Sequence, residues 1–310
     1  MSSFSSRSLY VALLALAVSG GALAQVQQGG VTITGDVDQD TTAVGGVVTN
    51  AGGAGGTAVT RIGNVSDSRV RGDLEQGTFV GGAVNTTTIG AGSGAATEIG
   101  NVSGSTINGD VDQDTRVVGA VSTISGGIVS NAVTKIGSTS DSTINDLEQD
   151  TTVGGVVLTN AAGAGAAANT EIGVVEDVRS ARGDVEQRTF VGGAVLTTSV
   201  AAGGSSSTEI GAIKDSAIDG SVEQNTRVTG AVTTTALGSL NTAVTEVGKI
   251  NKARVTGDVE QDTTVVGVVS TTSAGLGTDA CTSIGTIGKS DCDGDSLDDL
   301  VDSIEDVHDR

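Results

Sequence analysis

Apolar and polar residues alternate one by one along most of the chain. In residues 70–86, one parity carries Val70, Gln76 and Val80, and the other parity carries the charges, such as Glu75. Successive side chains of a β-strand point to opposite faces, so this alternation predicts strands with one face toward an interior. We expect the Val/Gln/Thr parity to face inward, because its residue types vary little between similar segments. The residue types of the charged parity vary more.

The alternating segment occurs seven times. Its glutamine marks each copy, at steps of 37, 37, 36, 38, 37 and 37 residues: Gln39, Gln76, Gln113, Gln149, Gln187, Gln224 and Gln261. Each glutamine is followed, 23 residues later, by an aliphatic residue and a glycine, as in Ile62-Gly63. A fixed period of this length is the signature of a repeat architecture.

Each period also contains a Gly/Ala/Ser-rich segment, such as residues 90–96, and a second strand that ends at the aliphatic residue. Matching strands joined by glycine-rich corners predict an all-β fold, a β-solenoid of seven ~37-residue repeats. Each repeat forms either one large coil or two smaller ones. An antiparallel sandwich is the alternative, but it does not explain the constant period and parity.

The N-terminal segment has the pattern of a bacterial secretory signal. Arg7 precedes an apolar run at residues 9–18, and Ala22-Leu23-Ala24 suits a signal peptidase. The run is too short to span a bilayer, so we expect no membrane span in the exported chain. The expected location is extracellular or at the cell surface after Gram-negative-type export, with the periplasm as the alternative.

These patterns divide the chain into four parts. The division is a signal peptide at residues 1–24, an N-terminal lead-in strand at 25–34, the seven-repeat solenoid at 35–288 and an acidic C-terminal cap at 289–310.

Composition excludes several classes of function. The chain has no Trp, no Pro, three Phe and one Tyr, and Phe4 and Tyr10 fall in the signal segment. Aromatic residues dominate the cores of most globular enzymes, so such a core is not expected here. His308 is the only histidine, which leaves no Ser/His/Asp or histidine–metal site, and we expect no enzymatic activity. The net charge of −21 opposes binding to nucleic acid.

The seven glutamines are expected to form a structural ladder. A buried amide is costly unless it is hydrogen-bonded, and stacked copies can bond to one another. An acidic residue precedes each glutamine on the outward parity: Asp38, Glu75, Asp112, Glu148, Glu186, Glu223 and Glu260. This column is either a solvated face or, with Asp36, Asp73, Asp110, Asp184 and Asp258 beside it, a row of calcium sites.

A second, longer period spans three repeats. The residue three positions after each glutamine is in turn Thr42, Phe79, Arg116, Thr152, Phe190, Arg227 and Thr264. Either the chain arose by duplication of a three-repeat block, or these residues form a binding row that recurs every third repeat.

The C-terminal region departs from the repeat. Five acidic residues with the spacing of a cation loop occur at Asp291, Asp293, Asp295, Asp299 and Asp302. The segment resembles the calcium loops of thrombospondin type 3 repeats and, more loosely, an EF-hand loop, so calcium is the candidate ligand; an acidic tail is the alternative. Residues 296–308 have the apolar stripe of a short helix. Cys281 and Cys292, the only cysteines, are expected to form a disulfide beside it.

The inward Gln and Thr columns, the Gly/Ala/Ser corners, the absence of Pro and the secretory signal resemble the secreted repeat proteins of bacterial functional amyloid, the curlin and Fap fibre subunits. The resemblance implies fibre formation, with self-association or related fibre subunits as partners. We therefore expect a secreted structural protein of a fibre, extracellular matrix or cell surface, with no required cofactor. The alternative is a surface-binding rod for polysaccharide, mineral or ice that uses calcium.

Overall fold

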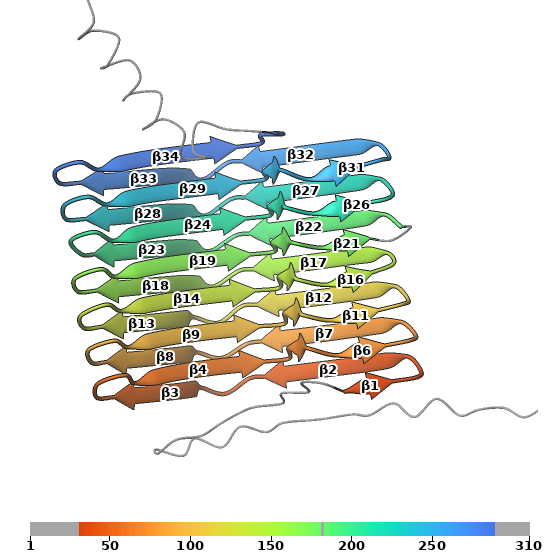
Figure 1. Ribbon diagram of the computed structural model, residues 1–310, viewed down its shortest axis with the longest axis horizontal. Coiled ribbons are helices and arrows are strands. Elements are labelled where there is room, and N and C mark those ends of the chain that lie inside the picture. Colours follow the sequence, from red (N-terminus) through yellow and green to blue (C-terminus); the bar gives the residue numbers. More distant parts are fainter. Residues whose placement is uncertain (1–30, 181–182, 289–310) are drawn as a thin grey trace, which may run out of the picture.

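The computed structural model describes residues 31–180 and 183–288, and these form a β-solenoid of seven stacked coils (Figure 1). The strands of the described residues fall into five parallel sheets, named A to E. Each strand pairs with its counterpart one repeat away, as Val37 pairs with Leu74 and Gln39 with Gln76. One repeat therefore makes one coil, which confirms the predicted β-solenoid and rules out the antiparallel sandwich.

Sheet A contains β1 (Thr32–Ile33), β6 (Arg69–Val70), β11 (Thr106–Ile107), β16 (Thr143–Ile144), β21 (Arg179–Ser180), β26 (Ala217–Ile218) and β31 (Arg254–Val255). Sheet B contains β2 (Val37–Ala43), β7 (Leu74–Val80), β12 (Val111–Val117), β17 (Leu147–Val153), β22 (Val185–Val191), β27 (Val222–Val228) and β32 (Val259–Val265). Sheet C contains β3 (Val47–Gly52), β8 (Val84–Ile89), β13 (Val121–Gly126), β18 (Val156–Ala162), β23 (Ala194–Val200), β28 (Ala231–Leu237) and β33 (Val268–Ala274). Sheet D contains β4 (Thr57–Ile62), β9 (Gly94–Ile99), β14 (Asn131–Ile136), β19 (Ala167–Ile172), β24 (Ser205–Ile210), β29 (Thr242–Val247) and β34 (Asp279–Ile284). Sheet E contains β5 (Val65–Ser66), β10 (Val102–Ser103), β15 (Thr139–Ser140), β20 (Val175–Glu176), β25 (Ile213–Lys214) and β30 (Ile250–Asn251).

Each coil is flattened into two layers. Sheets B and C follow one another in the first layer, and the chain then turns and returns through sheets D, E and A (Figure 1). Part of the predicted lead-in strand is present as β1, which pairs with β6 and so belongs to sheet A. The steps of 36 and 38 residues between glutamines arise between the ends of sheet D and the starts of sheet B, outside the long strands, so every sheet keeps its register.

The alternation over residues 70–86 predicted one long strand, and that prediction was wrong. The segment contains three strands, because the chain bends at Arg71–Asp73 and again at Gly81–Ala83. At the second bend a Cβ on Gly82 would lie 2.0 Å from the carbonyl oxygen of Gly45 in the previous coil. The backbones of neighbouring coils approach too closely there for any side chain.

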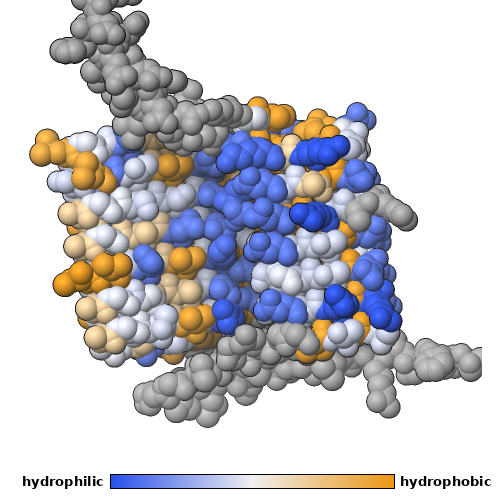
Figure 2. All heavy atoms as spheres, in the orientation of Figure 1, coloured by the Kyte–Doolittle hydropathy of each residue, from blue (hydrophilic) through white to orange (hydrophobic). Residues whose placement is uncertain are grey.

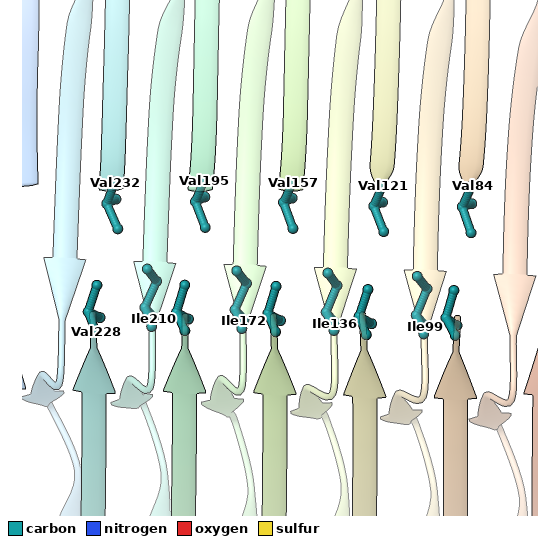
Figure 3. Packing of buried hydrophobic residues seen from close by; sticks show 14 of the residues in the cluster. Val84, Ile99, Val121, Ile136, Val157, Ile172, Val195, Ile210, Val228 and Val232 are labelled. Atoms are coloured by element: carbon teal, nitrogen blue, oxygen red, sulfur yellow. The ribbon is translucent and has the colours of Figure 1, made fainter. Parts of the chain in front are cut away.

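The interior is packed with aliphatic side chains, as the inward parity predicted. In each inner coil a valine that ends sheet B, a valine of sheet C and an aliphatic residue that ends sheet D meet in the core, as Val80, Val84 and Ile99 do (Figure 3). A second cluster lies between sheet B and sheets E and A, and includes Val65 and Val70. Each buried side chain of this size contributes about 1.5–3 kcal/mol, so every coil depends on its neighbours for its stability.

A hydrogen-bonded chain of threonines runs between sheets C and D through all seven coils. The hydroxyl of Thr97 lies 2.8 Å from that of Thr86, and Thr123 lies 2.7 Å from Thr97. The chain contains Thr49, Thr60, Thr86, Thr97, Thr123, Thr134, Thr159, Thr170, Thr197, Thr208, Thr234, Thr245, Thr271 and Thr282. These recurrent threonines face the interior, so they do not form an exposed lattice for ice.

Candidate functional site

The glutamine column is buried in sheet B, as predicted, but its hydrogen bonds differ from the expected ladder. The side chains stack in register, and one amide, that of Gln224, donates to Gln187 Oε1 at 2.9 Å. In six coils the Nε2 group instead donates to the carbonyl of the glycine that follows sheet D, as Gln113 does to Gly100. The glutamines therefore mainly join opposite layers of the solenoid, because that glycine bends its carbonyl toward sheet B.

The aspartates at the corner between sheets A and B have a structural role. Asp36 Oδ1 accepts the backbone N–H of Asp73 at 3.1 Å, and Asp73 Oδ1 accepts that of Asp110 at 3.0 Å. Asp184 Oδ1 likewise accepts the backbone N–H of Ser221. The carboxylates of Asp36, Asp73 and Asp184 therefore satisfy backbone donors of the next coil, and the alternative interpretation of the row as calcium sites stays a prediction.

The acidic residues before the glutamines form one outward column on sheet B. Asp112 pairs in register with Glu75 on one side and Glu148 on the other. Partial burial, followed by the charges of Glu148 and Asp150, raises the pKa of Asp112 above its ordinary value. Burial is also the main cause that raises the pKa of Asp114 and of Asp150. Like charges are therefore held together on this face at neutral pH.

We expect Asp112 to favour the folded state increasingly as the pH falls from neutrality toward the ordinary aspartate pKa of about 4. The folded-state pKa of Asp112 lies above its unfolded value, so between the two values the folded state binds more protons. Lowering the pH through that window favours folding. The measurement is the urea midpoint, followed by circular dichroism.

The matched variants for this pH effect are Asp112→Asn and Asp141→Asn. The first should raise the midpoint at pH 7 and reduce its pH dependence, while the second removes a carboxylate from the bend after sheet E and should leave the dependence unchanged. A midpoint that falls steadily between pH 7 and pH 5 would show that the column is not repulsive.

The residues that recur every third repeat, Thr, Phe and Arg in turn, also form a column on the outer face of sheet B. Phe79 pairs in register with Arg116, and Phe190 pairs with Arg227 in the equivalent coils of the second block. Around Phe190 the surface is hollowed by about 340 Å³, and the hollow is lined by Asp150, Thr151, Thr152, Arg188, Thr189, Phe190, Asn225 and Arg227. All of these residues come from β17, β22 and β27, three consecutive strands of sheet B.

The sequence did not predict a belt of ion pairs where sheet D meets sheet E. Lys214 Nζ lies 2.7 Å from Glu209 and 3.1 Å from Glu176, and Lys249 Nζ lies 2.6 Å from Glu246. Burial alone lowers the pKa of Lys214, but Glu209 and then Glu176 outweigh it and raise the pKa. The belt appears as the hydrophilic stripe in the middle of Figure 2. Its charges neutralise one another, so it stabilises the coil junction and offers little net charge to a ligand.

The opposite side of the solenoid carries almost no charge. The region in question begins after each sheet B strand and ends at the fourth residue of the next sheet D strand. In all seven repeats together, this region contains one charged residue, Asp279. We call this region, which contains sheet C and its loop to sheet D, the uncharged side. Its loops carry exposed aliphatic residues, which we call the aliphatic ridge: Ile89, Ile128, Val129, Val200, Leu237, Leu240 and Leu276. The ridge follows the left edge of the molecule in Figure 2.

Two residues of the ridge have strained backbones. Val129 has φ 56° and Leu240 has φ 57°, where five other coils have glycine with positive φ, among them Gly55 and Gly165. The left-handed conformation costs an L-residue roughly 1–2 kcal/mol, and it is a marked outlier for a β-branched residue. Leu240 is nevertheless 75% exposed, so the strain places an aliphatic side chain in solvent. Such strain is concentrated at functional sites.

The predicted calcium loop, Asp291, Asp293, Asp295, Asp299 and Asp302, lies outside the described residues, as do the signal peptide and the expected helix at 296–308. Cys281 lies in β34 and is not a free thiol, but Cys292 is also outside, so their pairing stays a prediction. Within residues 31–180 and 183–288, no three acidic, histidine or cysteine side chains are grouped to hold a metal ion. The same ranges contain no helix long and apolar enough to cross a membrane.

The fold places the chain in the class of parallel β-solenoid repeat proteins. Comparison with protein-family models, curated proteins and solved structures gave no match.

Proposed function

We propose that this protein is a secreted structural component of a fibre, extracellular matrix or cell surface, and that copies of it associate through their aliphatic ridges. The observation that carries the proposal is the segregation of charge: the charged residues avoid the side where the exposed aliphatic residues are collected. Contiguous exposed apolar surface of this kind marks interaction sites in soluble proteins.

A second copy is the partner that this surface fits best. Two chains with a net charge of −21 repel each other, and the repulsion is weakest where the uncharged sides meet. Five of the seven coils contribute residues to the ridge, so the ridge of a second copy presents aliphatic side chains at matching coil spacings. Such a self-complementary contact is typical of homo-oligomers.

Replacement of Val129 and Leu240 by glycine is expected to abolish association and leave the fold at least as stable. Glycine adopts the positive φ of both positions without a Cβ penalty, while the exposed aliphatic side chains are lost. Sedimentation velocity over a range of concentrations should show oligomers for the wild type and monomers for the double variant. The urea midpoint of the variant should be equal or higher.

Asp215→Gly is the matched control. Asp215 also has a positive φ of 50°, and the equivalent residue three repeats earlier, Gly104, shows that glycine fits that bend. The control relieves the same kind of strain away from the ridge, so it should associate like the wild type. A monomeric wild type, or a Val129→Gly/Leu240→Gly variant that associates normally, would contradict the proposal.

A surface-binding rod is the second candidate function. One observation favours it: both phenylalanines outside the signal segment are partly exposed on one outer column of sheet B.

A further inference from the structure

Phe79 and Phe190 are the only aromatic side chains beyond the signal segment, and neither is buried. They are 36% and 38% exposed on the outer face of sheet B, in a column whose other members are all threonine or arginine. Both occupy the same column, three coils apart, and each has an arginine in register on the next coil. The arrangement therefore occurs twice in the molecule.

Each ring extends along its strand over a glycine. A Cβ on Gly81 would lie 3.0 Å from Cε1 of Phe79, and a Cβ on Gly192 would lie 3.0 Å from Cε1 of Phe190. Most other coils have Val or Thr at this position, namely Val44, Val118, Thr229 and Val266. The glycines leave the space that each ring occupies.

The hollow beside Phe190 offers both hydrogen-bond donors and acceptors. Arg188, Arg227 and Asn225 supply N–H donors, and Asp150 supplies a carboxylate. Asp150 Oδ1 forms an ion pair with Nη1 of Arg188 at 3.7 Å and has no closer hydrogen bond from the described residues, so it can still accept one from a ligand. An acceptor of this kind is costly unless a hydroxyl or N–H group reaches it.

We propose that this hollow binds a neutral polysaccharide, with a sugar ring stacked on Phe190 and its hydroxyls bonded to Asp150, Asn225 and Arg227. A pyranose presents a face of C–H groups, which suits the electron-rich face of an aromatic ring, and an edge of hydroxyls that both donate and accept. Apolar contact with a few placed polar groups is the usual composition of a small-molecule site.

The charges around the site select against ionic ligands. Arg188 is ion-paired with Glu148 and Glu186, so these charges largely cancel and the hollow offers little net attraction to a polyanion or a cation. The equivalent position of Phe79 with Arg116 lies three coils away, about 14 Å at the spacing of β-strands, so one polysaccharide chain along the solenoid can contact both rings. Two linked contacts raise the overall affinity well above that of one. This inference rests on the second candidate function, surface binding, and is independent of self-association.

The test is affinity electrophoresis of the full mature chain through gels that contain galactomannan, xyloglucan or dextran as neutral probes, or alginate as an anionic one. The wild type should be retarded by at least one neutral polysaccharide. Phe190→Ala should raise the Kd about tenfold, and Phe79→Ala/Phe190→Ala should abolish retardation. Phe190→Leu keeps apolar volume without the aromatic face and should weaken binding as much as alanine does.

Leu196→Ala is the matched control, because Leu196 is 37% exposed in the same coil, on sheet C, and should not alter retardation. The proposal is overturned if no neutral polysaccharide retards the wild type, if only alginate does, or if the double phenylalanine variant is retarded as strongly as the wild type. Sedimentation separates this result from the self-association: the double variant should still form oligomers, because the aliphatic ridge is intact.

Discussion

Gly155→Ala is expected to destabilise the solenoid by about 3–5 kcal/mol, although it adds a single methyl group. A Cβ on Gly155 would lie 1.8 Å from the carbonyl oxygen of Gly119 and 2.8 Å from that of Val118, both in the preceding coil. These are backbone atoms between two paired strands, so they cannot move aside without breaking the ladders of sheets B and C. The change in urea midpoint, followed by circular dichroism, measures the effect.

The neighbouring glycine provides the control for this steric argument. A Cβ on Gly154 would have no atom closer than the carbonyl oxygen of Val117, at 4.0 Å. Gly154→Ala should therefore change stability by no more than about 0.5 kcal/mol. Equal effects of the two substitutions would mean that the close approach of the coils does not limit this bend.

Gln113→Leu is expected to destabilise the fold by about 1–3 kcal/mol, because the Thr139 hydroxyl loses its acceptor and the Gly100 carbonyl keeps only the 3.3 Å bond from Thr115 Oγ1. The Nε2 group of Gln113 donates to the carbonyl of Gly100, and its Oε1 accepts from Thr139 Oγ1 at 2.8 Å. All three residues lie between the two layers of the solenoid, where water cannot replace the lost bonds. Urea unfolding of the variant measures the loss.

Asp112→Asn is the control for the glutamine, since it alters the adjacent residue on the outward parity. It should be neutral or stabilising, because it removes a charge from a column of like charges. If Asp112→Asn cost more than Gln113→Leu, the buried amides would contribute less than the outer face does.

The sequence alone was sufficient to predict the solenoid and the orientation of its strands. The steps between Gln39 and Gln261 are regular because each coil must match the register of the next. The repeat length of the fold is therefore visible as a period in the sequence. The parity of residues such as Val80 and Val84 followed from the two-residue period of a strand, which is a local property.

The sequence did not determine which groups satisfy the buried amides. Gln113 bonds to Gly100, 13 residues earlier, rather than to the glutamines stacked above and below it. The choice depends on where the glycine bend directs its carbonyl, which is set by the positive φ of 62° at Gly100 and by the distance between the two layers. A one-dimensional pattern contains neither quantity.

The candidate surfaces depended on the tertiary structure in the same way. The Thr/Phe/Arg column was detectable as a three-repeat period in the sequence. The hollow beside Phe190, however, arises only when three coils are stacked. The ion pairs of Lys214 join residues from different coils and sheets, so no single segment of the sequence contains the pairing pattern. The aliphatic ridge consists of residues at the ends of sheet C strands and in the loops after them, and some, such as Ile128 and Leu240, are about three repeats apart in the chain. Periodicity therefore determined the fold, while the stacking of coils, which brings distant residues within contact, decided the surfaces that can bind a partner.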